Sequence, residues 1–234
     1  MKNNFFLSIQ GSYSLLDISL FNNLNILKNI KEDNFKGSSL LIPIIQNLLQ
    51  ENNLNLENLN FIAVDQGPGA FTSLRVTIST VNGLSFASKV PLIGIDGLDA
   101  LAEQAIKEIK NSQKTELLVV LLNAYNDDVY YKINSDKIEI QKGYKKIDLL
   151  LEEIKNIFEN QKINFVGNAI DLHKDKILNA FGKNSYFIDI QNVSSEQIAL
   201  IALNKFEKDK NSLSFKLAPL YLKSQNFAIR PTKK

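Results

Sequence analysis

The stretch FIAVDQGPGAFTSLR, residues 61–75, joins an apolar segment to a helix-forming one through a turn that contains two glycines. The pattern predicts a buried strand over Phe61–Asp65 and a helix over Thr72–Ser88. Glycines at such a turn let other groups approach the backbone closely, and free amides at the start of a helix attract anions. The candidate residues of a phosphate-binding loop are Gly67, Gly69, Thr72, which is also expected to cap the helix, and Arg75.

A second interpretation of the same loop is purely structural. Gly-Pro-Gly makes a tight turn in many proteins that bind no phosphate. The loop has neither the lysine of a P-loop nor the third glycine of a dinucleotide-binding fingerprint, which excludes both of those nucleotide sites. A phosphate site and a simple turn therefore both stay open on the sequence alone.

The pattern around the loop predicts one α/β unit. A strand meander comes first, and helices then alternate with strands, which is the order of a mixed sheet with parallel pairing at one end. The predicted elements are strands 5–9, 15–21 and 24–30, helix 38–50, the strand and helix that flank the loop, and strand 92–95.

The later part of the chain repeats this order, with strands 117–122, 129–133 and 138–141, helix 147–159, strand 163–166, helix 172–181, strand 186–190 and helix 194–206. A period of about 110 residues is too long for a solenoid. We therefore predict an α/β fold of two tandem RNase H-like domains with mixed sheets, the layout of the actin, Hsp70 and sugar-kinase class. The predicted domain limits are 1–100 and 115–234, with a helical linker over 101–114.

Composition excludes several classes of function. The 27 lysines and arginines are balanced by 25 acidic residues, and a net charge of +2 is too small for strong independent binding to nucleic acid. The absence of cysteine excludes disulfides, thiolate metal sites and a cysteine nucleophile. No apolar run approaches the ~20 residues needed to span a membrane, and no targeting segment is visible. A globular cytoplasmic protein without a membrane partner is expected.

Two predicted helices carry more apolar residues than one core contact needs. In helix 38–50 they cover an arc of roughly 200°, and in helix 72–88 they are spread around nearly the whole circumference. Such helices lie either between layers of their own molecule or against another chain. The candidates for a partner interface are Leu41, Ile44, Ile45, Leu48, Leu49, Leu74, Ile78 and Val81.

The motif GPGAFTSLR, residues 67–75, resembles the GPGSFTGLR signature of the TsaB family of tRNA threonylcarbamoyladenosine biosynthesis proteins. Further similarities follow in order along nearly the whole chain. They lie at residues 38–45 (SSLLIPII), 90–95 (VPLIGI), 98–102 (LDALA), 121–130 (LLNAYNDDVY), 165–169 (FVGNA) and 219–223 (PLYLK).

The resemblance implies a non-catalytic scaffold that pairs with a TsaD-like catalytic subunit through two helices of the N-terminal domain. That subunit would transfer a threonylcarbamoyl group to adenosine 37 of tRNA, forming t6A. A TsaE-like ATPase is implied as a further partner, and a homodimer when the catalytic subunit is absent. The resemblance implies no resident cofactor and leaves weak ATP binding open.

Departures from the family pattern bear on nucleotide chemistry. Gln10 and Asn123 stand where the family usually has aspartate, and Gly37 stands where it often has histidine. An amide offers hydrogen bonds but no charge to a magnesium ion or an attacking water. The candidate phosphate loop is therefore interpreted as vestigial.

An enzyme is the alternative, namely an actin-like ATP-dependent kinase or phosphatase that uses the Gly67–Gly69 loop. Asp65 and Asp96 each follow a predicted strand and would be its best catalytic candidates, although a turn former and a helix cap are the simpler roles. A metalloprotease needs paired metal-binding histidines. His173 is the single histidine, and it lies in a polar helix where a surface position is expected.

Overall fold

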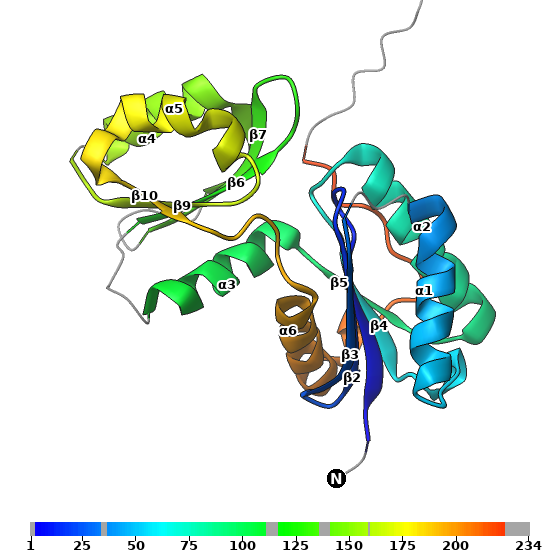
Figure 1. Ribbon diagram of the computed structural model, residues 1–234. Helices are drawn as coiled ribbons and strands as arrows, with labels where there is room; N and C mark the ends of the chain where they lie inside the picture. The colour runs from blue at the N-terminus through cyan, green and yellow to red at the C-terminus, as the bar shows by residue number, and fades with distance from the viewer. Residues whose placement is uncertain (1–2, 34–36, 111–116, 136–140, 159, 223–234) are drawn as a thin grey trace, which may run out of the picture.

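The computed structural model describes residues 3–33, 37–110, 117–135, 141–158 and 160–222. These residues form two similar halves, each built on a five-stranded mixed sheet (Figure 1). The first half contains β1 (Phe5–Gln10), β2 (Leu16–Asn22), β3 (Asn25–Glu32), α1 (Gly37–Glu51), β4 (Phe61–Asp65), α2 (Phe71–Ser88), β5 (Leu92–Ile95) and α3 (Gly97–Lys110). The second contains β6 (Leu117–Asn123), β7 (Asp128–Ser135), β8 (Gln141–Lys146), α4 (Ile147–Ile157), β9 (Ile163–Val166), α5 (Ile170–Phe181), β10 (Ser185–Ile188) and α6 (Ser195–Lys208).

Both sheets have the same strand order. The first runs β3-β2-β1-β4-β5 and the second runs β8-β7-β6-β9-β10 when read in the same sense. In each, the opening three strands pair antiparallel and the remaining pairs are parallel. This confirms the predicted α/β fold of two tandem RNase H-like domains, because hairpin turns force antiparallel pairing and helical crossovers force parallel pairing.

Helices cover both faces of each sheet, and the two inner helices are exchanged between the halves. Helices α1 and α2 lie on the outer face of the first sheet, and α4 and α5 on the outer face of the second (Figure 1). Between the sheets, α3 packs on β6, β7 and β9, whereas α6 packs on β1, β2, β4 and β5. Each half therefore buries the inner face of its sheet under a helix that belongs to the other half in sequence.

The exchange crosses the predicted limits of residues 1–100, 101–114 and 115–234. Residues 101–110 are helical, as expected of the linker, but they are part of α3 and cover the second sheet. Residues 111–114 lie outside the described residues. The domain limits themselves stay a prediction. The contacts establish only that α3 and α6 each pack on the sheet of the other half.

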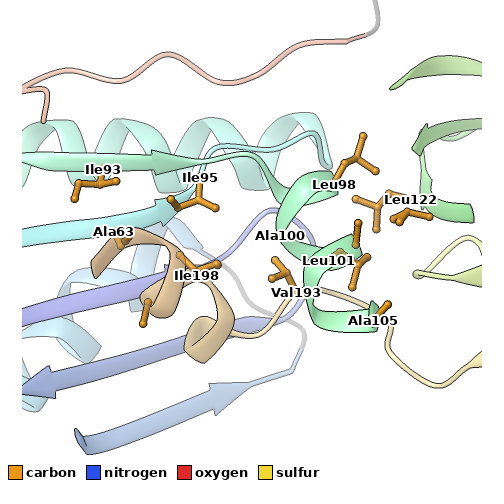
Figure 2. Close-up of a cluster of buried hydrophobic side chains, with 14 of the residues drawn as sticks. Ala63, Ile93, Ile95, Leu98, Ala100, Leu101, Ala105, Leu122, Val193 and Ile198 are labelled. Carbon is orange, nitrogen blue, oxygen red and sulfur yellow. The ribbon is translucent and has the colours of Figure 1, made fainter. Parts of the chain in front are cut away.

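One continuous apolar core joins the halves. It contains Ala63, Ile93 and Ile95 from the first sheet, Leu122 from the second, and side chains of α3 and α6 between them (Figure 2). Aromatic rings extend it, since the ring of Phe61 stacks on Phe6 at 4.4 Å and lies 4.8 Å from Phe206 of α6. Burial of so much apolar surface between the sheets opposes their separation.

A buried polar cluster anchors the start of α6 on the first sheet. The carboxylate of Asp17 on β2 accepts hydrogen bonds from the backbone N–H and the hydroxyl of Ser195, at 3.0 and 2.8 Å. Ser8 donates to the carbonyl oxygen of Ser195 at 2.6 Å, and Asn29 donates to Asp17 at 2.7 Å. A carboxylate at a helix N-terminus also complements the helix dipole. The cluster fixes where α6 begins.

The third strand of the second sheet is misplaced by the sequence pattern. A strand was predicted over 138–141, whereas β8 spans Gln141–Lys146, and residues 138–140 lie outside the described residues. The sequence QKGYKK has little apolar alternation because β8 is a largely exposed edge strand.

Within the ranges that the structure describes, no helix combines the length and apolar character needed to cross a bilayer.

We predict that Asp17→Ala lowers the free energy of unfolding by roughly 2–4 kcal/mol, since it removes a buried acceptor of charge-assisted hydrogen bonds and leaves the Ser195 N–H unpaired. Urea denaturation measures the change. Asp175→Ala, at an exposed position of α5, is the control and should leave the midpoint unchanged. A loss below about 1 kcal/mol for Asp17→Ala would contradict the anchoring role.

Candidate functional site

The turn after β4 is shaped by contacts within the chain. Gly67 has a φ of 102°, and a Cβ there would lie 2.7 Å from the side chain of Leu74. Its backbone N–H donates to the carboxylate of Asp65 at 2.9 Å. Glycine is therefore required at position 67 by backbone conformation and by close packing.

The second glycine of the loop lets it lie against the turn after β1. A Cβ on Gly69 would overlap the carbonyl oxygen of Ser12. The same carbonyl accepts a hydrogen bond from the N–H of Ala70 at 2.8 Å. Both glycines are thus explained by the fold, and the amides of Gly67 and Ala70 are already paired.

The C-terminal strap, defined here as Leu213–Leu222, lies against the same loop. The side-chain amide of Gln66 donates to the carbonyl oxygen of Ala218 at 2.6 Å. The backbone N–H of Leu220 donates in return to the carbonyl oxygen of Gln66 at 2.8 Å. The strap therefore contacts the main chain of the loop that was considered for phosphate.

The remaining candidates for phosphate binding, Thr72 and Arg75, lie exposed on the first turns of α2. The prediction that Thr72 caps this helix is wrong, because the N-cap residue is Ala70 and no side chain makes a cap hydrogen bond there. The guanidinium of Arg75 lies 4.8 Å from the ring centroid of Phe71. Arg75 therefore makes a cation–π contact on the surface of α2.

The residues at this site do not fit a magnesium-bound nucleotide. Gln10 is buried, its side-chain nitrogen donates to Ser12 at 3.2 Å, and its side-chain oxygen has no partner in the described part of the chain. The side-chain oxygen of Asn123 accepts from the N–H of Tyr125 at 2.8 Å. No group of three or more histidine, cysteine or acidic side chains suited to a metal ion occurs among the described residues. The expectation of no resident cofactor stays a prediction.

Asp65 is buried at the end of β4, and burial raises the pKa of its carboxyl to about 6. Hydrogen bonds from Ser12 and from the N–H of Gly67 lower this pKa, and nearby Asp96 raises it. The predicted role of Asp65 as a turn former is confirmed by its bond to Gly67. Its carboxyl holds the loop against the turn after β1.

Asp96 has the predicted role of a helix cap. One of its carboxylate oxygens accepts from the N–H groups of Leu98 and Asp99 at the start of α3, at 3.0 and 3.1 Å. The other accepts from Lys142 of β8 at 2.6 Å. Lys142 and Lys132 both form ion pairs with Asp99. Burial alone would raise the pKa of Asp99, but the two lysines outweigh it and lower this pKa below its ordinary value. The acidic groups beside α3 are therefore paired.

His173 does not lie on the surface, contrary to the prediction from its polar surroundings. Its side chain lies on the buried face of α5. Burial lowers the pKa of His173, and the positive charge of Lys176 lowers it further. The nearby Asp171, Lys174 and Asp175 are polar because they occupy the exposed face of the same helix. A neutral, buried imidazole is a packing group here.

The predicted partner contacts lie inside the protein, with the exception of half-buried Ile44. These core side chains fill the space between the first sheet and its outer helices, so the prediction is corrected for Leu41, Ile45, Leu48, Leu49, Leu74, Ile78 and Val81. A filled core is the physical reason, since close packing between the first sheet and its outer helices requires apolar side chains from both helices.

Other apolar side chains of the same helices are exposed. On α1, Leu40 and Ile42 are 41% and 56% exposed, and on α2, Phe71 and Phe86 are 39% and 77% exposed. The spread of apolar residues in these two helices did indicate a second apolar face. Periodicity alone does not say which face packs on the sheet. No sequence pattern indicated that Gln66 forms a hydrogen bond with the strap. None indicated the role of Tyr13 either, whose hydroxyl donates to the carbonyl oxygen of Asn123 at 2.9 Å and so joins the halves.

Comparison with known proteins assigns the family. The model of the TsaD family, tRNA N6-adenosine threonylcarbamoyltransferase, matches residues 36–225. The chain belongs to this family, and within it is similar to the TsaB and YeaZ proteins.

Two curated relatives are TsaB proteins of Buchnera aphidicola. The one from subspecies Acyrthosiphon pisum is 24% identical over 228 residues, 95% of this chain and 99% of its own. The one from subspecies Baizongia pistaciae is 28% identical over 223 residues, 92% and 96% of the two chains. A Pseudomonas aeruginosa protein described as similar to the peptidase YeaZ has the same fold, with a TM-score of 0.72, 19% identity and coverage of 94% and 100%.

We predict that Asp65 makes the protein less stable as pH rises. Because its folded-state pKa of about 6 lies above the ordinary 3.8, the protonated carboxyl favours the folded state, and this contribution is lost between pH 4 and 6. Asp65→Asn should therefore gain about 2 kcal/mol relative to wild type between pH 4.5 and 7. Urea unfolding of both proteins at the two pH values measures it. A constant difference would contradict the raised pKa.

Proposed function

We propose that this chain is a non-catalytic subunit that supports formation of t6A in tRNA by pairing with a TsaD-like catalytic subunit. The family match over residues 36–225 and the two TsaB relatives support a role in this tRNA modification. The observation that carries the pairing is the exposed apolar surface on α1 and α2, outside a core that is already filled.

That surface belongs to two helices that contact each other on the outer face of the first sheet (Figure 1). Ile42 and Phe86 are more than half exposed although large and apolar. Covering such side chains with a partner removes apolar area from water, which favours association. Few charges lie among them on α2, where Arg75 is the single charged residue of Phe71–Ser88. A partner with an apolar helical face fits this surface.

The buried and paired polar groups support an accessory rather than a catalytic role. Asp65 holds the turn, Asp96 caps α3, and Gln10 and Asn123 offer no charge. A phosphoryl- or acyl-transferring enzyme needs a base or a metal ligand that is free to meet a substrate. We place the chemistry on the TsaD-like subunit, with a TsaE-like ATPase as a further partner, a homodimer of this chain when the catalytic subunit is absent, and the cytoplasm as the location.

The pairing is tested by placing a charge on the exposed face. We predict that Ile42→Glu weakens binding to a TsaD-like subunit by roughly 100-fold, since the carboxylate would be buried without a partner in the complex. Leu149→Glu on α4 is the matched control, because Leu149 is 54% exposed against 56% for Ile42. It should leave binding unchanged. Calorimetry measures the affinities, and thermal unfolding verifies that both variants fold.

Equal affinities for the two variants would contradict the proposed surface. A core position gives a different result: Ile45→Glu should unfold the protein, because Ile45 is 2% exposed inside the first-half core. Loss of binding with a folded Ile45→Glu variant would show that α1 is seated differently.

A further inference from the structure

The C-terminal strap is bound to the first half by contacts that recognise its main chain. Ser214 and Leu92 exchange backbone hydrogen bonds of 2.7 and 3.0 Å, which adds the strap to the free edge of β5. The side chain of Asn82 on α2 accepts from the N–H of Leu217 at 2.8 Å and donates to its carbonyl oxygen at 2.9 Å. The side-chain amide of Asn82 thus binds both the N–H and the carbonyl oxygen of Leu217, as the backbone of a neighbouring strand would.

The strap then continues along α2 toward the start of that helix. Gln66 holds the main chain at Ala218 and Leu220, as described above, and the ring of Tyr221 lies 5.9 Å from that of Phe71. The side chain of Leu217 packs on the first-half core. Gly94 leaves room for the side-chain amide of Gln66, because a Cβ at position 94 would overlap that amide and lie 3.3 Å from the side chain of Leu217. An extended segment is therefore clamped at both ends of α2.

Helix α2 has reason to need such a clamp. Its buried stripe includes Thr77 and Ser85, so it gains less from burial against the sheet than an all-apolar stripe would give. Its neighbours in the described structure include α1, β5, the 3-10 turn Leu56–Asn58 and the strap. The residues that tie it to the strap, Phe71, Asn82 and Ser85, span most of its length.

We propose that the strap is a positioning element for the partner surface: by fixing α2 on the sheet, Gln66 and Asn82 set the orientation in which Phe71, Arg75 and Phe86 meet a partner. This rests on the proposed function, since it deepens the role of α2 in pairing. The loop that resembled a phosphate site serves instead as one end of a main-chain clamp. Because the strap follows α6, the clamp also links α2 to the helix that joins the halves.

The test uses the full chain with Asn82→Leu, which removes both side-chain bonds to Leu217 while keeping a side chain of similar size. Hydrogen exchange followed by mass spectrometry should show amides of residues 214–220 and of α2 exchanging roughly ten-fold faster or more. Affinity for a TsaD-like subunit should fall about ten-fold. Gln66→Leu, which removes the bond to Ala218, should shift both readouts in the same direction. Asn179→Leu, at an exposed asparagine of α5, is the control and should shift neither.

Unchanged exchange in both strap variants would overturn the clamp. Faster exchange with unchanged affinity would overturn its role in pairing while leaving the proposed function intact. If the wild-type chain itself failed to bind a TsaD-like subunit, the proposed function would fall, and slow exchange of α2 that depends on Asn82 would still support the clamp.

Discussion

The burial of α6 against the first sheet is the interaction on which the rest of the structure depends. This helix comes from the far end of the described chain, yet it covers β1, β2, β4 and β5, while α3 covers the second sheet. Burial of apolar side chains drives the exchange, and the Asp17–Ser195 hydrogen bonds fix its register. The inner face of each sheet is therefore covered by a helix that belongs to the other half in sequence.

The path of the chain after α6 follows from this placement. Once α6 ends on the first sheet, the strap is within reach of β5 and α2, where Leu92 and Asn82 bind its main chain. The strap then meets the glycine turn, whose shape is set by Asp65 and Ser12. The side chains of Asp65, Gln66 and Asn82 are thereby engaged in hydrogen bonds that hold these segments together. On the outer helices α1 and α2, the large apolar side chains Leu40, Ile42, Phe71 and Phe86 stay exposed to the solvent.

The sequence predicted the elements that have strong patterns. Phe61–Asp65, Leu92–Ile95 and Ile163–Val166 are strands with the predicted bounds, because all three are apolar runs that are mostly buried, including β5 at the edge of its sheet. The edge strand β8 was misplaced, since an exposed edge needs no apolar alternation. The exchange of α3 and α6 was not predicted, because two similar sheets offer each helix an equivalent surface and the periodicity does not say which one it takes.

The candidate site was less predictable than the fold. Asp96 was identified as a helix cap and Asp65 as a turn former, because position after a strand carries that information. Leu74 and Ile78 were assigned to a partner although they face the sheet, since an apolar stripe does not reveal which neighbour it meets. Gln66 and Asn82 escaped attention because their role depends on a strap more than a hundred residues away.

The most direct test of an accessory role is t6A formation on unmodified tRNA in a reconstituted reaction that is supplied with the threonylcarbamoyl donor and ATP. A TsaD-like subunit with its ATPase partner is assayed with and without this chain, and the chain is assayed alone. The account predicts product when the chain and the catalytic subunit are both present, and none from the chain alone. Product from the chain without the TsaD-like subunit, or an equal rate when the chain is left out, would contradict it.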